Sequence, residues 1–228
     1  MGSDDLFKKR KKIRNSSKLT RGGGKRSPLE KILIVCEGEK TEPNYFRALV
    51  QHLRLHTADV VDISGDCDSS PSSVVSFAID EYHNSKRLRK DYSKVYCVID
   101  KDSHPCYQRS LDVILRFEPK GIFHAITSIP CFEYWLYLHF QYSTKTFNNV
   151  EGSSSGEQME KELKKFMPDY NKNDKSIFLQ LVGQLDFAIQ NSIRARQEAL
   201  SSGNDNPSTK IDELVTELVE MKKRFVGE

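Results

Sequence analysis

The chain has 228 residues, 37% of them hydrophobic, and a formal net charge of +3 at pH 7. This length is enough for one sizeable domain with its own core. No apolar run of about eighteen residues occurs, which excludes a membrane-spanning helix, and the basic start lacks the apolar stretch of a signal peptide. The five cysteines show no C-x-x-C spacing, so neither a disulfide framework nor a zinc site is indicated. We therefore expect a cytoplasmic protein that does not engage membranes.

Positive charge is concentrated at the start of the chain. Residues 1–31 hold eleven Lys or Arg against three acidic residues, a local net charge of +8. This stretch is too polar and Gly-rich to fold alone, so residues 1–30 are predicted to be a flexible basic arm. The arm would bind nucleic-acid phosphates, and a purely solubilising tail is the alternative. The candidate nucleic-acid-binding residues are Lys8, Lys9, Arg10, Lys11, Lys12 and Arg14.

Beyond the arm, short apolar runs alternate with amphipathic segments. Strands are predicted at 31–36, 58–63, 95–99 and 122–126, and helices at 43–55, 73–89 and 106–117. This alternation is typical of parallel β-α-β units with helices on both faces of the sheet. Residues 31–141 are therefore predicted to form an α/β core.

The last third of the chain has a different pattern. Residues 141–156 are polar and rich in Ser and Gly, which indicates a boundary. Helices are predicted at 157–166, 175–200 and 209–224, with Ser208 or Thr209 as the cap of the last one. Residues 157–228 are thus predicted to form a helical subdomain packed on the core.

Two predicted strands end in acidic residues. Strand 95–99 is followed by Asp100 and Asp102, and strand 31–36 by Glu37. An extended chain points Asp100 and Asp102 to the same side, and the carboxyl ends of parallel strands meet in one crevice. Three carboxylates there repel one another unless a cation neutralises them. We expect Glu37, Asp100 and Asp102 to bind Mg²⁺, with Mn²⁺ as the alternative ion. Helix caps are the other interpretation, because a lone D-x-D is a weak motif.

Two further residues are candidates for the same site. Glu133 is the one charge in the aromatic segment 130–140, which is predicted to be a buried helix. A buried carboxylate needs a cation, a metal or a role as a base. Lys40 is placed to offset charge on a phosphate, and a surface lysine in a turn is the alternative.

Several blocks of sequence resemble the RloB-like family of TOPRIM-related proteins, which are associated with restriction and abortive-infection loci in bacteria. The resemblance runs from Ile32 to the C-terminal helix. It is carried by I-V-C-E-G-E-K-T-E-P-N-Y-F (34–46), D-K-D (100–102), I-P-C-F-E-Y-W-L (129–136), Y-N-K (170–172) and N-P-S-T (206–209).

The resemblance implies a TOPRIM-like Rossmannoid parallel sheet flanked by helices. It also implies that Glu37 acts as a general acid/base or metal ligand while Asp100 and Asp102 bind Mg²⁺ for phosphodiester chemistry. With Lys40 and Glu133 these residues describe a nuclease for RNA, such as tRNA, or for DNA. Such an enzyme is expected to be the toxic effector of an anti-phage system with a separate ATPase partner, and a homo-oligomer is left open.

Two alternatives remain open at this point. One is a non-catalytic TOPRIM-like module that binds nucleic acid or a partner protein. The other is a haloacid-dehalogenase-like phosphatase with Asp100 as nucleophile and Asp102 as acid/base. His104 stands where that phosphatase motif has Thr or Val, which disfavours this reading.

Overall fold

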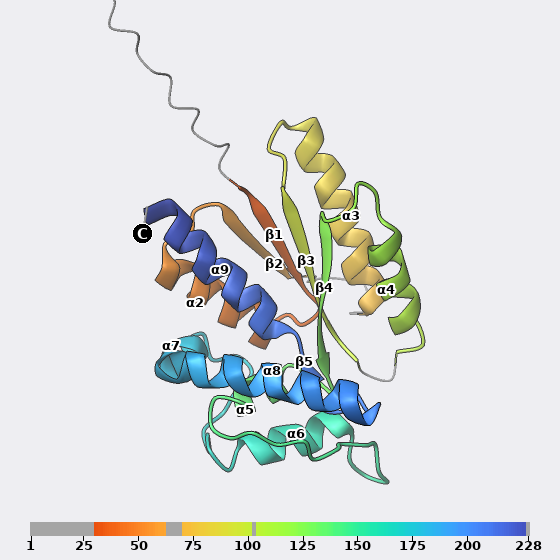
Figure 1. Ribbon diagram of the computed structural model, residues 1–228, viewed down its shortest axis with the longest axis vertical. Helices are drawn as coiled ribbons and strands as arrows, with labels where there is room; N and C mark the ends of the chain where they lie inside the picture. Colours follow the sequence, from red (N-terminus) through yellow and green to blue (C-terminus); the bar gives the residue numbers. More distant parts are fainter. Residues whose placement is uncertain (1–29, 63–69, 102–103, 227–228) are drawn as a thin grey trace, which may run out of the picture.

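A computed structural model describes residues 30–62, 70–101 and 104–226 of the chain (Figure 1). Its centre is one sheet with the strand order β2-β1-β3-β4-β5. The strands β1 to β4 are parallel, and the short β5 is antiparallel to β4. This confirms the predicted α/β fold with a largely parallel sheet. The strands are β1 (Ile32–Cys36), β2 (Ala58–Asp62), β3 (Lys94–Asp100), β4 (Phe123–Ile129) and β5 (Ser208–Thr209).

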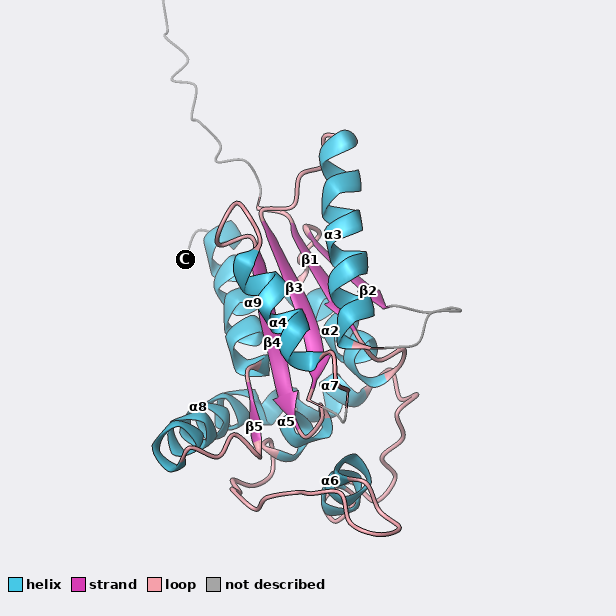
Figure 2. Ribbon diagram, turned by 90° about the vertical axis from the view of Figure 1, so that its right-hand side faces the viewer, coloured by secondary structure: helices cyan, strands magenta, loops and turns pink. Residues whose placement is uncertain are grey.

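Helices cover both faces of this sheet (Figures 1 and 2). The helices α3 (Pro71–Arg87) and α4 (Tyr107–Arg116) lie on one face, and α2 (Thr41–Leu53) and α9 (Ile211–Val226) lie on the other. The remaining helices gather beyond the carboxyl ends of the strands. These are α5 (Glu133–Tyr137), α6 (Ser155–Leu163), α7 (Ile177–Leu181) and α8 (Leu185–Ser202), with a 3₁₀ turn at Val182–Gln184 between the last two.

The strand β1 shows why the sheet needs cover on both faces. Ile32 and Ile34 pack in the core under α2 and α9, whereas Leu33 and Val35 pack in the core under α3 and α4. Successive side chains of a strand point to opposite faces, so a strand buried on both faces is a continuous apolar run. The sequence I-L-I-V-C has this composition.

The C-terminal third returns to the sheet. Leu214 and Leu218 of α9 are fully buried in the same core cluster as Ile34 of β1. The strand β5 pairs with the end of β4, where the hydroxyl groups of Ser128 and Thr209 lie 3.0 Å apart and fully buried. Residues 157–228 therefore share their core with residues 31–141. No helix within the described ranges has the length and apolarity to cross a bilayer.

Three predicted elements differ from the structure. The helix predicted over 130–140 is confined to α5, Glu133–Tyr137. The predicted helix 175–200 is divided into α7, the 3₁₀ turn and α8, with Gly183 in the turn. The predicted cap residues Ser208 and Thr209 form β5, although the Thr209 hydroxyl still accepts the backbone N–H of Ile211 at 3.2 Å.

Candidate active site

A cavity of about 450 Å³ lies at the carboxyl ends of β1 and β3. This is where ligands bind in open parallel sheets. The beginning of α2, the start of α5 and the start of α6 form its walls. Its lining residues are Gly38, Glu39, Lys40, Thr41, Glu42, Asp100, Cys131, Glu133, Ser154, Gly156, Glu157, Glu160 and Lys172. The structure thus brings the predicted site residues Lys40, Asp100 and Glu133 to one cavity.

Glu37 is hydrogen-bonded directly to one of these residues, Asp100. The parallel pairing of β1 with β3 places the two strand ends side by side, and the backbone N–H of Glu37 donates to the carbonyl of Val98 at 3.2 Å. Oε2 of Glu37 accepts the backbone N–H of Asp100 at 3.1 Å. Its Oε1 lies 3.8 Å from Nε2 of His104, which is an ion pair when that histidine is protonated. Glu37 is therefore held beside Asp100, as the alignment of strand ends predicts.

Asp100 carries an unsatisfied oxygen. Its Oδ2 accepts the backbone N–H of Phe132 at 3.1 Å, but its Oδ1 is buried and has no hydrogen-bond partner among the described residues. Burial, followed by the charges of Glu42, Glu133 and Glu37, raises the pKa of Asp100 well above its usual value. Buried polar atoms in native proteins are nearly always satisfied. A bound cation would satisfy this oxygen and favour the ionised form of Asp100.

Glu42 is a site residue that the sequence reasoning did not select. It lies in the first turn of α2, is almost fully buried and lines the cavity. Burial and the charge of Glu133 raise the pKa of Glu42 to about 7. In the sequence, Glu42 looks like an ordinary acidic residue at a helix start, and only its place in the E-G-E-K-T-E segment marks it.

The glycine after Glu37 makes room for Glu42. A Cβ atom on Gly38 would lie 2.2 Å from Oε2 of Glu42, which is much closer than real contacts allow. Any other residue at this position would displace the Glu42 carboxylate or the backbone.

Glu133 has two partners from the segment between α6 and α7. Its Oε1 accepts the Tyr170 hydroxyl at 2.9 Å and lies 3.0 Å from Nζ of Lys172. Burial alone would raise the pKa of Glu133, but Lys172 and the thiol of Cys131 outweigh it and lower that pKa. Glu133 is therefore an ionised carboxylate with a compensating cation. Tyr170 and Lys172 were part of the family resemblance, but no site role followed from their types.

Carboxylate oxygens are concentrated at this cavity. Asp100 and Glu42 line it, and Glu37 is hydrogen-bonded to the backbone of Asp100. Their carboxylates are the ligands preferred by hard cations such as Mg²⁺. Within the described ranges, no three His, Cys, Asp or Glu side chains form a ready-made metal site. Asp102 lies outside the described residues, so the predicted pairing of Asp100 with Asp102 on one side of the strand remains a prediction. The predicted arm residues Lys8, Lys9, Arg10, Lys11, Lys12 and Arg14 also lie outside them.

Lys40 lines the cavity from the residue before α2. It is exposed, and no side-chain hydrogen bond caps the helix at this position. Together with Lys172, whose side chain is about half exposed, it places positive charge beside the carboxylates. The cavity can therefore accommodate a cation on its acids and an anionic group near its two lysines.

Comparison with known proteins gives one match. Residues 32–218 match the family model described as RloB-like protein. No curated protein and no solved structure matches the chain.

Proposed function

The chain belongs to the RloB-like family, and from this premise we propose that its acidic cavity is the active site of a metal-dependent nuclease. The reaction would be hydrolysis of phosphodiester bonds in RNA or DNA. The observation that carries the proposal is the unsatisfied, buried Oδ1 of Asp100 among the carboxylates of Glu37, Glu42 and Glu133. A cluster of this kind is costly to a protein unless a cation binds to it.

Asp100, Glu37 and Glu42 are the residues that would hold Mg²⁺, with Asp102 as a further ligand. When bound, the ion would offset the charge of the phosphate and lower the pKa of a water molecule. Glu37 is fixed by the backbone N–H of Asp100, so its carboxylate is oriented before substrate arrives. Its Oε1, which lies 3.8 Å from Nε2 of His104, would act as the proton acceptor.

The two lysines of the cavity have a complementary task. Lys40 and Lys172 would contact non-bridging oxygens of the scissile phosphate as point charges. Lys172 forms an ion pair with Glu133. Glu133 therefore keeps the ammonium group of this lysine near the cavity. Glu133 thus acts on the substrate through Lys172.

The basic start of the chain is proposed to add affinity for nucleic acid without sequence preference. Deletion of residues 1–26 is expected to weaken binding and to flatten the slope of log affinity against log salt concentration. An unchanged slope would show that the arm takes no part. A separate ATPase as partner, and a role in anti-phage defence, are further proposals from the family resemblance.

Cleavage of total tRNA and of plasmid DNA tests the activity. The protein is incubated with Mg²⁺ or with EDTA, alone and, if an ATPase is encoded beside it, together with that ATPase, and compared with Asp100→Ala. Glu151→Ala is the matched control because Glu151 is an exposed carboxylate outside the cavity lining. We expect cutting that needs Mg²⁺, is lost in Asp100→Ala and is retained in Glu151→Ala.

Calorimetric titration with Mg²⁺ and Mn²⁺ gives a second readout that does not depend on substrate or partner. Binding by the wild type that is lost in Asp100→Ala supports the metal site. Absence of both cutting and metal binding would contradict the proposal and favour a non-catalytic binding module.

A further inference from the structure

Polar side chains form a continuous stripe along the outer side of α2. The side that packs in the core carries Tyr45, Phe46 and Leu49. Residues three, four or seven positions apart lie on one face of a helix. The positions with this spacing on the opposite side, called the α2 stripe below, are Lys40, Asn44, Arg47, Gln51 and Arg54. The α2 stripe therefore holds three cationic side chains, two amides and no acidic residue.

The α2 stripe joins two cavities. At one end, Lys40 lines the acidic cavity of the candidate active site. At the other end, Arg47, Gln51 and Arg54 line a groove of about 550 Å³. A helix rises about 1.5 Å per residue, so the distance from Lys40 to Arg54 along α2 is about 21 Å. A chain-like ligand on the α2 stripe would therefore have one end in the active site.

The groove lies at the outer edge of β2. Its apolar lining comes from Val50 and Leu55 near the end of α2 and from Ala58 and Val60 of β2. Within the described part of the chain, β2 pairs with β1 alone, so its other edge has no neighbouring strand. The groove thus combines apolar surface with arginine side chains. This combination suits a nucleic-acid strand, whose bases have apolar faces and whose backbone is anionic.

The charges of the α2 stripe are available to a ligand. Lys40 and Arg54 are exposed and have no ion-pair partner among the described residues. Arg47 is paired with Asp62 through one terminal nitrogen at 2.5 Å, and its side chain is 47% exposed. A guanidinium has five N–H donors, and an exposed ion pair contributes only about 0–1 kcal/mol. A phosphate can therefore bind to Arg47 beside Asp62 or in its place.

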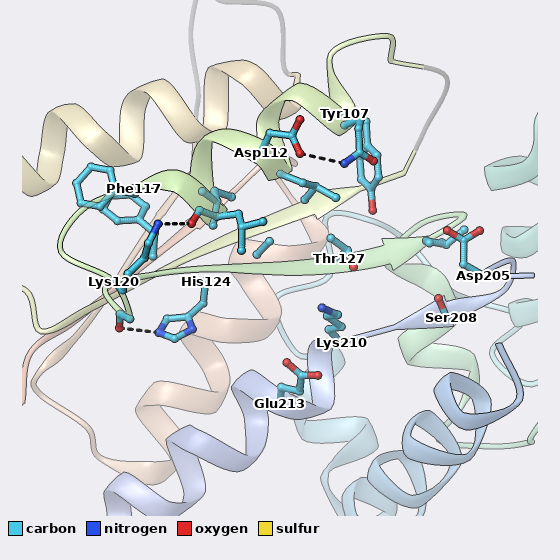
Figure 3. Close-up of a pocket in the computed structure, with 18 residues that line it drawn as sticks. Tyr107, Asp112, Phe117, Lys120, His124, Thr127, Asp205, Ser208, Lys210 and Glu213 are labelled. Carbon is cyan, nitrogen blue, oxygen red and sulfur yellow. Dashed lines mark hydrogen bonds between the residues drawn. The ribbon is translucent and has the colours of Figure 1, made fainter. Parts of the chain in front are cut away.

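The cavity between α4 and the outer edge of β4 lacks this pattern, although its volume of about 620 Å³ is larger (Figure 3). Its lysines, Lys120 and Lys210, lie among the carboxylates of Asp205 and Glu213. Lys120 also lies 3.2 Å from Glu118. Of these two cavities, only the groove beside β2 is joined to the candidate active site by a row without acidic side chains.

The size and charge of the cavities favour one strand over a duplex. Cavities of about 450 and 550 Å³ have the size that encloses a small molecule, such as one nucleotide. The active-site cavity is also lined by Glu39, Glu157 and Glu160. These carboxylates repel phosphates, and a duplex would bring twice as many phosphates to them as a single strand.

We propose that the α2 stripe binds a single strand of nucleic acid that extends from the groove beside β2 into the active-site cavity. This inference rests on the proposed nuclease function. Arg47 and Arg54 bind phosphates at a distance from the scissile one, and Asn44 and Gln51 donate to phosphate or sugar oxygens. Contacts to the backbone position a strand but carry no sequence preference.

Fluorescence anisotropy with labelled oligonucleotides tests the proposal. A strand of about 12 nucleotides is longer than the α2 stripe at the spacing of one phosphate per 3.4 Å. The probes are oligouridine, oligothymidine and the duplex of each with its complement. The full chain is titrated into each probe in EDTA, which keeps the strand intact, at a series of KCl concentrations. We expect the single strands to bind more tightly than the duplexes.

The double variant Arg47→Gln/Arg54→Gln removes two phosphate contacts. Each contact to a single strand contributes about 0.7 to the slope of log affinity against log salt concentration, so the slope should flatten by about 1.4. Arg109→Gln/Arg116→Gln is the matched control. It removes two exposed arginines seven residues apart at α4, on the other face of the sheet, and should leave the slope unchanged. Arg47→Lys/Arg54→Lys keeps both charges and should retain most of the slope.

Magnesium binding and cleavage separate this inference from the proposed function. Arg47→Gln/Arg54→Gln should bind Mg²⁺ as the wild type does in calorimetric titration, and should raise KM for cleavage of the single strand without lowering kcat. Binding of the strand that depends on these arginines, in a protein that neither binds Mg²⁺ nor cuts, would support the binding surface and contradict the nuclease.

Three results would overturn the inference even where Mg²⁺-dependent cleavage is confirmed. One is an unchanged slope in Arg47→Gln/Arg54→Gln, which would leave the open edge of β2 to an extended peptide segment. The second is an equal loss in Arg109→Gln/Arg116→Gln, because net charge alone would then explain the effect. The third is binding of the duplexes as tightly as of the single strands.

Discussion

The backbone N–H of Asp100 donates a 3.1 Å hydrogen bond to Oε2 of Glu37, so the two acidic strand ends are linked as well as adjacent. This link uses the backbone of Asp100 and leaves its side chain available. The substitution Asp100→Asn therefore keeps the link to Glu37 and can still accept the N–H of Phe132. It removes one charge from a group of mutually repelling carboxylates.

Asp100→Asn is expected to leave the free energy of unfolding without metal equal to or above that of the wild type at neutral pH. The affinity for Mg²⁺ should fall at least about tenfold, which corresponds to about 1.4 kcal/mol. Urea unfolding and calorimetric titration measure the two effects. Lower stability with unchanged metal affinity would show that Asp100 is only a structural acceptor.

Gly38→Ala is expected to displace the carboxylate of Glu42, because the new Cβ would lie 2.2 Å from Oε2. Overpacking of this kind typically costs about 1–3 kcal/mol of stability. The double variant Gly38→Ala/Glu42→Ala removes the collision and should regain most of that loss. Thermal unfolding of both single variants and the double variant forms a complete cycle; additive effects would show that Gly38 is needed for another reason.

Tyr170→Phe is expected to disturb the cavity by releasing Glu133. The Tyr170 hydroxyl donates to Glu133 at 2.9 Å and lies 3.4 Å from the Thr41 hydroxyl, so it joins α5 to the start of α2. Loss of a hydrogen bond to a charged group costs roughly 1.5–3 kcal/mol.

The matched control for this prediction is Tyr134→Phe, which removes a hydroxyl bonded to the Ser143 carbonyl outside the cavity. Both variants should lose stability in urea unfolding. Only Tyr170→Phe should reduce the rate of cleavage and the affinity for Mg²⁺. Equal losses in both variants would make Tyr170 a purely structural residue.

His139 should make stability fall in mild acid. It is buried, its Nδ1 donates to the Trp135 carbonyl at 3.0 Å, and its Nε2 has no partner among the described residues. Burial lowers its pKa from 6.5 to about 4. The unfolded chain therefore binds a proton more readily than the folded chain between these two values.

The sign of the effect follows from this difference. The free energy of unfolding is unaffected by His139 above pH 6.5. It falls as the pH is lowered towards 4, by roughly 3 kcal/mol in total from this one residue. His139→Asn keeps a donor near the Trp135 carbonyl but does not titrate. Its stability should show a smaller decrease over the same range, and an equal decrease would assign the effect to other groups.

The parallel part of the sheet was predictable because each of its strands is a short apolar run with its own boundary. Such a run can be recognised from the local sequence alone, without knowledge of its tertiary contacts. β5 was not predictable in the same way, since a strand of two residues has no period. It is defined by its pairing with Ser128 and Ile129 of β4, where the hydroxyl groups of Ser128 and Thr209 also meet. These residues are far apart in the chain.

The site was predictable to the extent that it is built from strand ends. Glu37 and Asp100 follow apolar runs, and parallel pairing then places them together. Glu42 was not predicted as a site residue because an acid in the first turn of a helix is common. Its burial depends on the absence of a side chain at Gly38. Tyr170 and Lys172 were not predicted as site residues because they lie in a polar segment without a periodic hydrophobic pattern.

The return of α9 to the sheet has a consequence for the order of folding. The α9 side chains Leu214, Val215, Leu218 and Met221 are fully buried in one core cluster with residues of β1 and α2, which precede them by 161 to 189 residues. Contacts with so large a separation form slowly and late. During synthesis, α2 alone covers this face of the sheet until α9 has been made. Until then the apolar side chains that α9 covers are exposed, and surface of this kind makes a folding chain prone to aggregation.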